Sequence, residues 1–166
     1  MKRLLKERYL RNPLVISIAS LMIILFGSIY VGEFNKYEAK ELIENSVSGL
    51  NTLNNTIVLA SATILASLLS SLSITSRTNS KLTKDHYDLI LLIAKIDTAV
   101  FVVSLVFFLL FNLPVTQSDS IDESLYTPLY YGSIIVASAI SAALIYVVLL
   151  LYYSIISMIQ ILGLGV

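Results

Sequence analysis

The chain has 166 residues, of which 57% are hydrophobic and only 13% are charged, and its formal net charge is zero. A soluble domain has about 45–50% apolar and about 25% charged residues, so this composition excludes an ordinary water-soluble domain and indicates a protein surrounded by lipid. The chain has no cysteine, which excludes disulfides, thiolate metal sites and cysteine nucleophiles. Its single histidine, His86, excludes a multi-histidine metal site within one chain.

Four apolar runs are each long enough to cross a hydrocarbon core of about 30 Å as a helix. They cover residues 13–31, 53–74, 89–113 and 129–153. The sequence therefore predicts an all-α fold: a four-helix transmembrane bundle with up-down-up-down topology and short connections. In this interpretation residues 1–166 form a single polytopic domain that is integral to a cell or cytoplasmic membrane. The lipid bilayer is then its main binding partner.

Charge is distributed unevenly between the two ends of these spans. Residues 1–13 hold five Lys or Arg and residues 76–88 hold three, whereas residues 32–52 hold two and residues 114–128 hold none. Because basic residues are enriched in cytoplasmic loops, both the N and the C terminus are predicted to be cytoplasmic. The first external segment carries an apolar stripe over 33–50, which we expect to extend the first helix outward.

The second span is rich in small residues that recur every four positions, a pattern that lets helices approach closely in lipid. Two such rows are Ala62/Ala66/Ser70 and Thr63/Ser67/Ser71.

The third span contains two ionisable residues within the stretch LLIAKIDTAVFVV. Lys95 lies about 9 Å inside the apolar run, and its long side chain can reach back to the inner headgroups. Asp97 is too short to do so, and a charged Asp at depth costs about 2.5–3.5 kcal/mol on insertion scales. We therefore expect Asp97 to face the interior of the bundle, together with Ser104, which lies seven residues later on the same helix face.

Depth matching predicts the neighbours of Asp97 on the second helix. If that helix leaves the membrane near Thr75, the residues about eight positions earlier are level with Asp97, and these are Ser67, Ser70 and Ser71. Three interpretations remain open for this group. It is a polar lock that fixes helix packing, or it lines a wet cavity or pore that binds a cation or relays protons, or Asp97 pairs with a basic residue of a different protein.

Basic residues near the inner leaflet form a second predicted site. Arg77, Lys81 and Lys84 follow one another at helical spacing, and with Lys95 they are predicted to contact anionic lipid headgroups. The alternative is that they only set the topology.

Catalytic signatures are missing from the sequence, which has no H-E-x-x-H, no G-x-S-x-G and no glycine-rich phosphate loop. We therefore expect no enzyme activity, no cofactor, no metal and no nucleic-acid partner. Four helices leave little room for an internal path, so self-association is expected. The best interpretation is a homo-oligomeric channel or transport-type assembly with a polar path near Asp97. The alternative is an accessory or assembly subunit of a larger membrane protein complex, docked through its small-residue faces.

Overall fold

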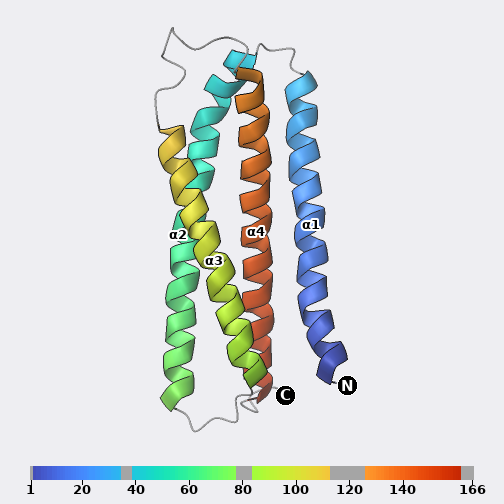
Figure 1. The fold of residues 1–166 in the computed structure, drawn as a ribbon, viewed down its shortest axis with the longest axis vertical. Helices are drawn as coiled ribbons and strands as arrows, with labels where there is room; N and C mark the ends of the chain where they lie inside the picture. Colours follow the sequence, from blue (N-terminus) through green and yellow to red (C-terminus); the bar gives the residue numbers. More distant parts are fainter. Residues whose placement is uncertain (1, 35–38, 78–83, 113–125, 162–166) are drawn as a thin grey trace.

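The structure is a computed structural model, and it describes residues 2–34, 39–77, 84–112 and 126–161. Every regular element in these ranges is an α-helix (Figure 1). The helices are α1 (Lys2–Phe34), α2 (Ala39–Arg77), α3 (Lys84–Phe111) and α4 (Tyr126–Ile161). The predicted all-α fold and the bundle of four helices are thus confirmed.

Each helix contains a stretch that is long and apolar enough to cross a membrane. These stretches are Arg11–Tyr30, Ser46–Ser73, His86–Phe111 and Thr127–Ile159, and they overlap the four predicted spans. Helices satisfy all their backbone hydrogen bonds internally, which is why apolar segments of this length adopt them in lipid. The last residue of the predicted third span, 113, lies outside the described residues.

One boundary differs from the prediction. The stripe over 33–50 was expected to extend the first helix, but α1 ends at Phe34 and residues 39–50 form the start of α2. The expectation is wrong because an apolar stripe identifies a helical segment without identifying which of its two neighbours it continues.

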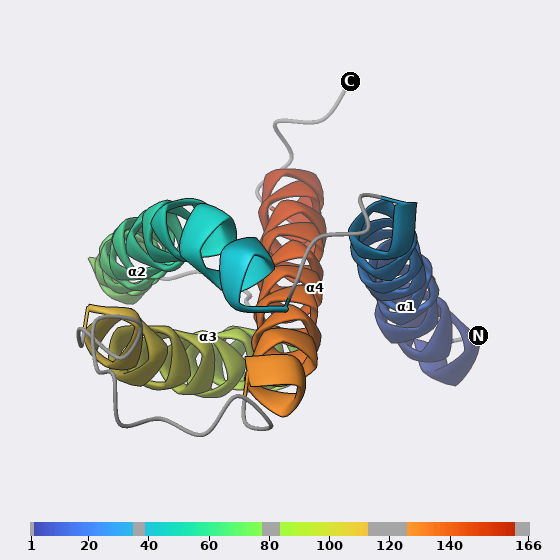
Figure 2. The same cartoon turned by 90° about the horizontal axis from the view of Figure 1, so that it is seen from above.

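The four helices do not surround one shared core. Viewed from above, α4 lies between α1 on one side and the α2–α3 pair on the other (Figure 2). The main packing partners agree with this view: α2 packs on α3, both pack on α4, and α1 packs on α4. The molecule is therefore a three-helix core of α2, α3 and α4, with α1 attached to the far side of α4.

The three-helix core contains two apolar clusters at different levels. One joins Ile57, Val100 and Ile140, one residue from each helix. The other joins pairs of residues from the same helices, namely Ile64, Leu68, Ile90, Ile93, Val147 and Leu150. Side chains from three helices that meet at one level, in steps of three and four residues, are typical of knobs-into-holes packing.

This packing fixes which face of each helix points inward. The buried face of α3 follows steps of four and three residues and consists of His86, Ile90, Ile93, Asp97, Val100 and Ser104. The buried face of α2 follows the same spacing and consists of Asn54, Ile57, Ser61, Ile64 and Leu68. Polar and ionisable residues thus occupy positions in the middle of otherwise apolar contact faces.

Candidate functional site

Asp97 is the most unusual member of the α3 contact face. Its side chain is 0% exposed, because Ile93 and Val100 on the same face hold it against α2 and α4. The Ser61 side chain of α2 is equally buried and lies near enough to interact with the Asp97 carboxyl, although the two do not reach full hydrogen-bond geometry. Asp97 and Ser61 therefore form a polar level within the contact between α2 and α3.

A second polar level lies two helical turns away. Asn54 precedes Ser61 by seven residues on α2, and Ser104 follows Asp97 by seven residues on α3. Because α2 and α3 are antiparallel, both steps run in the same direction along the bundle, about 10 Å. Asn54 and Ser104 are also almost completely buried. We call these four residues, Asn54, Ser61, Asp97 and Ser104, the polar seam.

The antiparallel register is fixed by a contact near one end of the seam. The Asn51 amide donates to Asn112 Oδ1 at 2.9 Å, and the Asn112 amide donates to Asn51 Oδ1 at 3.2 Å. Asn51 lies early in the apolar stretch of α2, and Asn112 directly follows α3. This reciprocal amide pair continues the polar contact of α2 with α3 beyond Asn54 and Ser104.

The seam contains buried polar atoms without hydrogen-bond partners among the residues that the structure describes. They are Asn54 Oδ1, Ser61 Oγ, Asp97 Oδ1, Asp97 Oδ2 and Ser104 Oγ. In folded proteins at least about 90% of buried polar groups have a partner, either in the protein or in ordered water. Five such atoms along one helix contact therefore lack the partners that buried polar groups normally have.

The predicted neighbours of Asp97 on α2 lie elsewhere. Ser67 and Ser70 are exposed and Ser71 is half-buried, and each hydroxyl donates to the backbone carbonyl four residues earlier at 2.9–3.0 Å. None of the three is bonded to Asp97. Depth matching pointed to the wrong turn as well as the wrong face. Ser67 follows Ser61 by six residues, about 9 Å along α2, and the apolar residues that pack on α3 and α4 turn Ser61 inward.

Ser104 is completely buried on the same face as Asp97, in line with their spacing of seven residues. Whether Asp97 and Ser104 act as a path or as a packing lock stays a prediction.

The predicted lipid-contact residues are only partly described. Lys95 is exposed on the outer side of α3, since residues two apart on a helix project to nearly opposite faces. Lys81 lies outside the described residues, as do the side chains of Arg77 and Lys84. Binding of anionic headgroups by these four residues stays a prediction.

A further buried polar residue, Ser138, lies on α4 away from the seam. Ser138 is buried with its hydroxyl unpartnered by any described residue. It lies two residues, about 200° around the helix axis, from Ile140, which faces α2 and α3, so Ser138 faces α1. Among residues 11–30 of α1, whose side chains the structure describes, Pro13 and Ser17 are buried, and the Ser17 hydroxyl donates to the Leu14 carbonyl at 2.9 Å.

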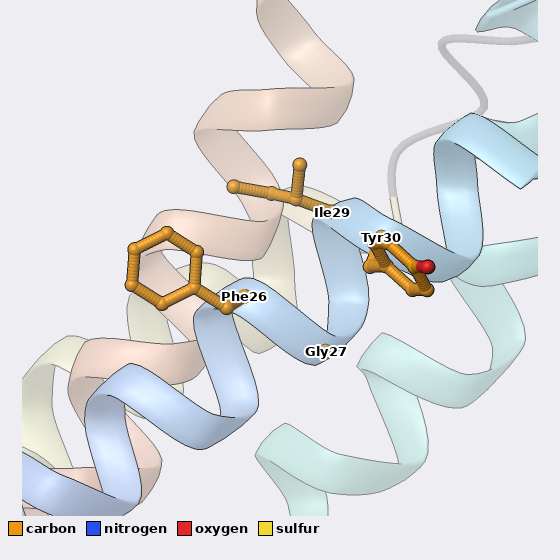
Figure 3. Close-up of a pocket in the computed structure, with 4 residues that line it drawn as sticks. All are labelled: Phe26, Gly27, Ile29 and Tyr30. Carbon is orange, nitrogen blue, oxygen red and sulfur yellow. The ribbon is translucent and has the colours of Figure 1, made fainter.

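An open hollow of about 420 Å³ lies along α1. Its described lining comes from two successive turns, with Phe26, Gly27, Ile29 and Tyr30 (Figure 3). The lining is largely apolar and lacks the convergent polar groups that orient a substrate. The hollow is suited to lipid chains rather than to chemistry.

Three residues of the polar contacts were missed by the sequence analysis: Asn54, Ser61 and His86. Asn54 and Ser61 are seven residues apart, as are Ile57 and Ile64. This heptad spacing is the signal that places Asn54 and Ser61 on the buried face of α2. His86 was assigned to the basic loop, but it is 4% exposed because α3 begins at Lys84. A polar segment before an apolar run does not show where the helix starts.

The described residues hold no group of three or more His, Cys, Asp or Glu side chains able to bind a metal ion. Comparisons with protein-family models, curated proteins and solved structures found no match for this chain. The geometry of the polar seam is therefore what supports a function.

Proposed function

We propose that this chain is a small, non-enzymatic, multi-pass membrane protein of the transport type, in which a small cation or a proton moves along the polar seam. The observation that carries this proposal is the unpartnered carboxyl of Asp97, buried between α2 and α3 and followed by the unpartnered polar atoms of Ser104 and Asn54. Intramembrane acids of this kind generally face water or protein partners and mark ion or proton pathways.

A purely structural lock accounts less well for this geometry. A lock stabilises helix packing when its polar groups bond one another, and a partly satisfied network is worse than an apolar contact. In the seam, Ser61 lies near the Asp97 carboxyl without full hydrogen-bond geometry, and the Asn54 amide donates to its own helix, to the Leu50 carbonyl at 3.0 Å. Water or a cation that completes these bonds accounts for the arrangement.

The seam also has the extent that a pathway needs. From Asp97 to Ser104 it covers about 10 Å along α3, and the amide pair of Asn51 and Asn112 lies beyond Ser104. From Asp97 to Asn112 the polar contacts thus extend about 22 Å along α3, about three quarters of a hydrocarbon core of about 30 Å.

The orientation in the membrane is part of the proposal. We place both termini in the cytoplasm, with the helices in up-down-up-down order. The bias of basic residues supports this, and so does the arrangement in which α1 begins and α4 ends at the same end of the bundle (Figure 1).

Self-association is proposed to use an exposed face of α2. Within the described residues, this face carries five hydroxyls within about 60° around the helix axis, each of which donates to its own helix backbone. We call it the α2 hydroxyl face: Thr52, Thr56, Thr63, Ser67 and Ser70. The same face of α2 also exposes Leu59, and α1 exposes large apolar side chains such as Ile23 and Phe26. Small hydroxyl-bearing residues are enriched where membrane helices contact one another.

The same face favours a second candidate function, that of an accessory or assembly subunit of a larger membrane complex. In that case the α2 hydroxyl face docks on a different protein, and the seam carries no flux. Purification in mild detergent separates the two candidates. Recovery of self-oligomers alone argues for the transport-type assembly, whereas a stoichiometric second protein argues for the accessory role.

Flux across reconstituted vesicles tests the transport proposal. We expect wild-type protein to carry H⁺, Na⁺ or K⁺ down an imposed gradient, and both Asp97→Asn and Ser104→Ala to lower that flux. Ser20→Ala is the matched control, because the Ser20 hydroxyl lies on α1 and donates to the Ile16 carbonyl. Absence of flux of all three ions, with the protein folded and inserted, would contradict the proposal.

A further inference from the structure

His86 is the second ionisable side chain on the buried face of α3. It is 4% exposed, and both ring nitrogens lack a hydrogen-bond partner among the described residues. It precedes Asp97 by eleven residues, which is close to three full helical turns and about 16 Å. His86 and Asp97 therefore point toward the same side of α3, at two different depths.

The packing of α3 on α4 shows what lies opposite His86. In the apolar cluster next to it, α3 contributes Ile90 and Ile93 while α4 contributes Leu150 and Val147. His86 lies four residues before Ile90 on α3, and Ser154 lies four residues after Leu150 on α4. Because the two helices are antiparallel, both steps lead toward the same end of the bundle. Ser154 is also buried. His86 is thus at a polar level of its own, at the end of the bundle where α3 begins.

We propose that the species moved along the polar seam is the proton, and that His86 is the relay group between Asp97 and the end of the bundle where α3 begins. This inference rests on the proposed transport function and names its substrate.

The side chains on the route support a proton over a metal cation. A desolvated metal cation needs several oxygen ligands at one level, whereas each level of the seam offers one carboxylate or amide and one hydroxyl. A carboxylate, a hydroxyl and an imidazole each accept and release a proton, and the Asn54 amide can bind a water molecule. Because these levels lie about 10 Å or more apart, the proton needs a chain of waters between them. Intramembrane Asp and His residues are typical of proton relays.

Among the side chains that the structure describes, His86 and Asp97 are the buried ionisable pair of α3. No Asp, Glu, Lys or Arg occurs in residues 46–73 of α2 or 126–161 of α4. On α4, the half-buried Tyr146 packs on the apolar cluster. On α3 itself, Lys95 and Asp88 are exposed.

The transfer conserves protons and charge at each group. The neutral His86 ring takes up a proton on one nitrogen and releases the proton of the other, and it regains its starting tautomer before the next cycle. The Asp97 carboxylate accepts a proton and then gives it up. Between them lies the apolar cluster that includes Ile90 and Ile93, so water must enter this cluster for each transfer, and an apolar constriction of this kind acts as a gate.

Vesicles that contain an internal pH indicator test the proposal. A potassium diffusion potential drives the ions, and the flux of H⁺, Na⁺ and K⁺ is followed in parallel for wild type, His86→Gln, Asp97→Asn and the control Ser20→Ala. We expect H⁺ flux in wild type and in Ser20→Ala, and a loss of at least about tenfold in His86→Gln, as for removal of an acid–base group. A second variant, His86→Ala, should regain H⁺ flux when imidazole is added.

The outcomes separate this inference from the function on which it rests. Flux of Na⁺ or K⁺ without H⁺ would overturn the proton assignment and leave the transport function intact. If both histidine variants carried H⁺ at the wild-type rate and imidazole had no effect, the role of His86 alone would be overturned. Absence of flux of every ion from folded protein would remove the transport function itself.

Discussion

Asp97 of α3 and Ser61 of α2 meet inside the three-helix core, both completely buried, at the level next to the Ile57–Val100–Ile140 cluster. Neither side chain has a full hydrogen bond to a described residue. This pair is repeated seven residues away by Ser104 and Asn54, so that polar side chains replace apolar ones at regular positions of a close helix contact.

Replacement of Asp97 by an apolar residue separates a pathway from a lock. We expect Asp97→Val to abolish flux but to leave the free energy of unfolding unchanged within about 1 kcal/mol, or to raise it, because removal of an unsatisfied buried polar group is neutral or stabilising. Thermal unfolding in detergent measures this. A clear loss of stability would show instead that Asp97 locks the helices together.

The packing layers predict a contrast between two isoleucines. Ile93 of α3 is 0% exposed and Ile23 of α1 is 73% exposed. Ile93→Ala should lower the free energy of unfolding by about 2 kcal/mol, because it leaves a cavity in the core. Ile23→Ala should change it little, since lipid replaces the lost methyl groups. Equal effects in unfolding experiments would contradict the assigned inward face of α3.

The amide pair of Asn51 and Asn112 should couple α2 to α3. In a double-mutant cycle of Asn51→Ala and Asn112→Ala, we expect a coupling free energy of about 0.6 kcal/mol, a common value for hydrogen bonds between membrane helices. Asn55→Ala with Asn112→Ala is the control, because Asn55 is exposed on α2. A coupling indistinguishable from that control would place α2 and α3 in a different register.

Gly27 borders the hollow on α1, and a Cβ atom added there meets nothing within 4 Å. Gly27→Ala should therefore raise the free energy of unfolding by about 0.5–1 kcal/mol, since glycine within a helix is less favourable than alanine by that amount. Unfolding in detergent is the measurement. A decrease would indicate that this position packs closely against another surface.

Much of the fold follows from hydropathy. The apolar runs identify four helices, and the cost of a carboxylate in lipid turns Asp97 inward. The α4 stretch is the longest and most apolar of the four, with a mean hydropathy of 2.8 against 1.8–2.4 for the others, as suits a helix with neighbours on two sides. Hydropathy does not show which helices those neighbours are, because side-chain packing decides that.

The site was predictable in part for the same reason. Depth matching led to Ser67 and Ser70, which follow Ser61 by about two helical turns and lie on the exposed face of α2. The face is decided by Ile57, Ile64 and Leu68, which pack on α3 and α4. His86 was missed because the start of α3 at Lys84 lies within a polar segment that resembles a loop.

Water access to the seam tests the central claim most directly. The chain has no cysteine, so Ser104→Cys and Ser138→Cys each create a single thiol at a buried position, the first in the seam and the second at the α1–α4 contact. In intact vesicles a charged, membrane-impermeant thiol reagent should modify Ser104→Cys and spare Ser138→Cys. Modification of neither thiol, or of both at the same rate, would contradict a hydrated seam between α2 and α3.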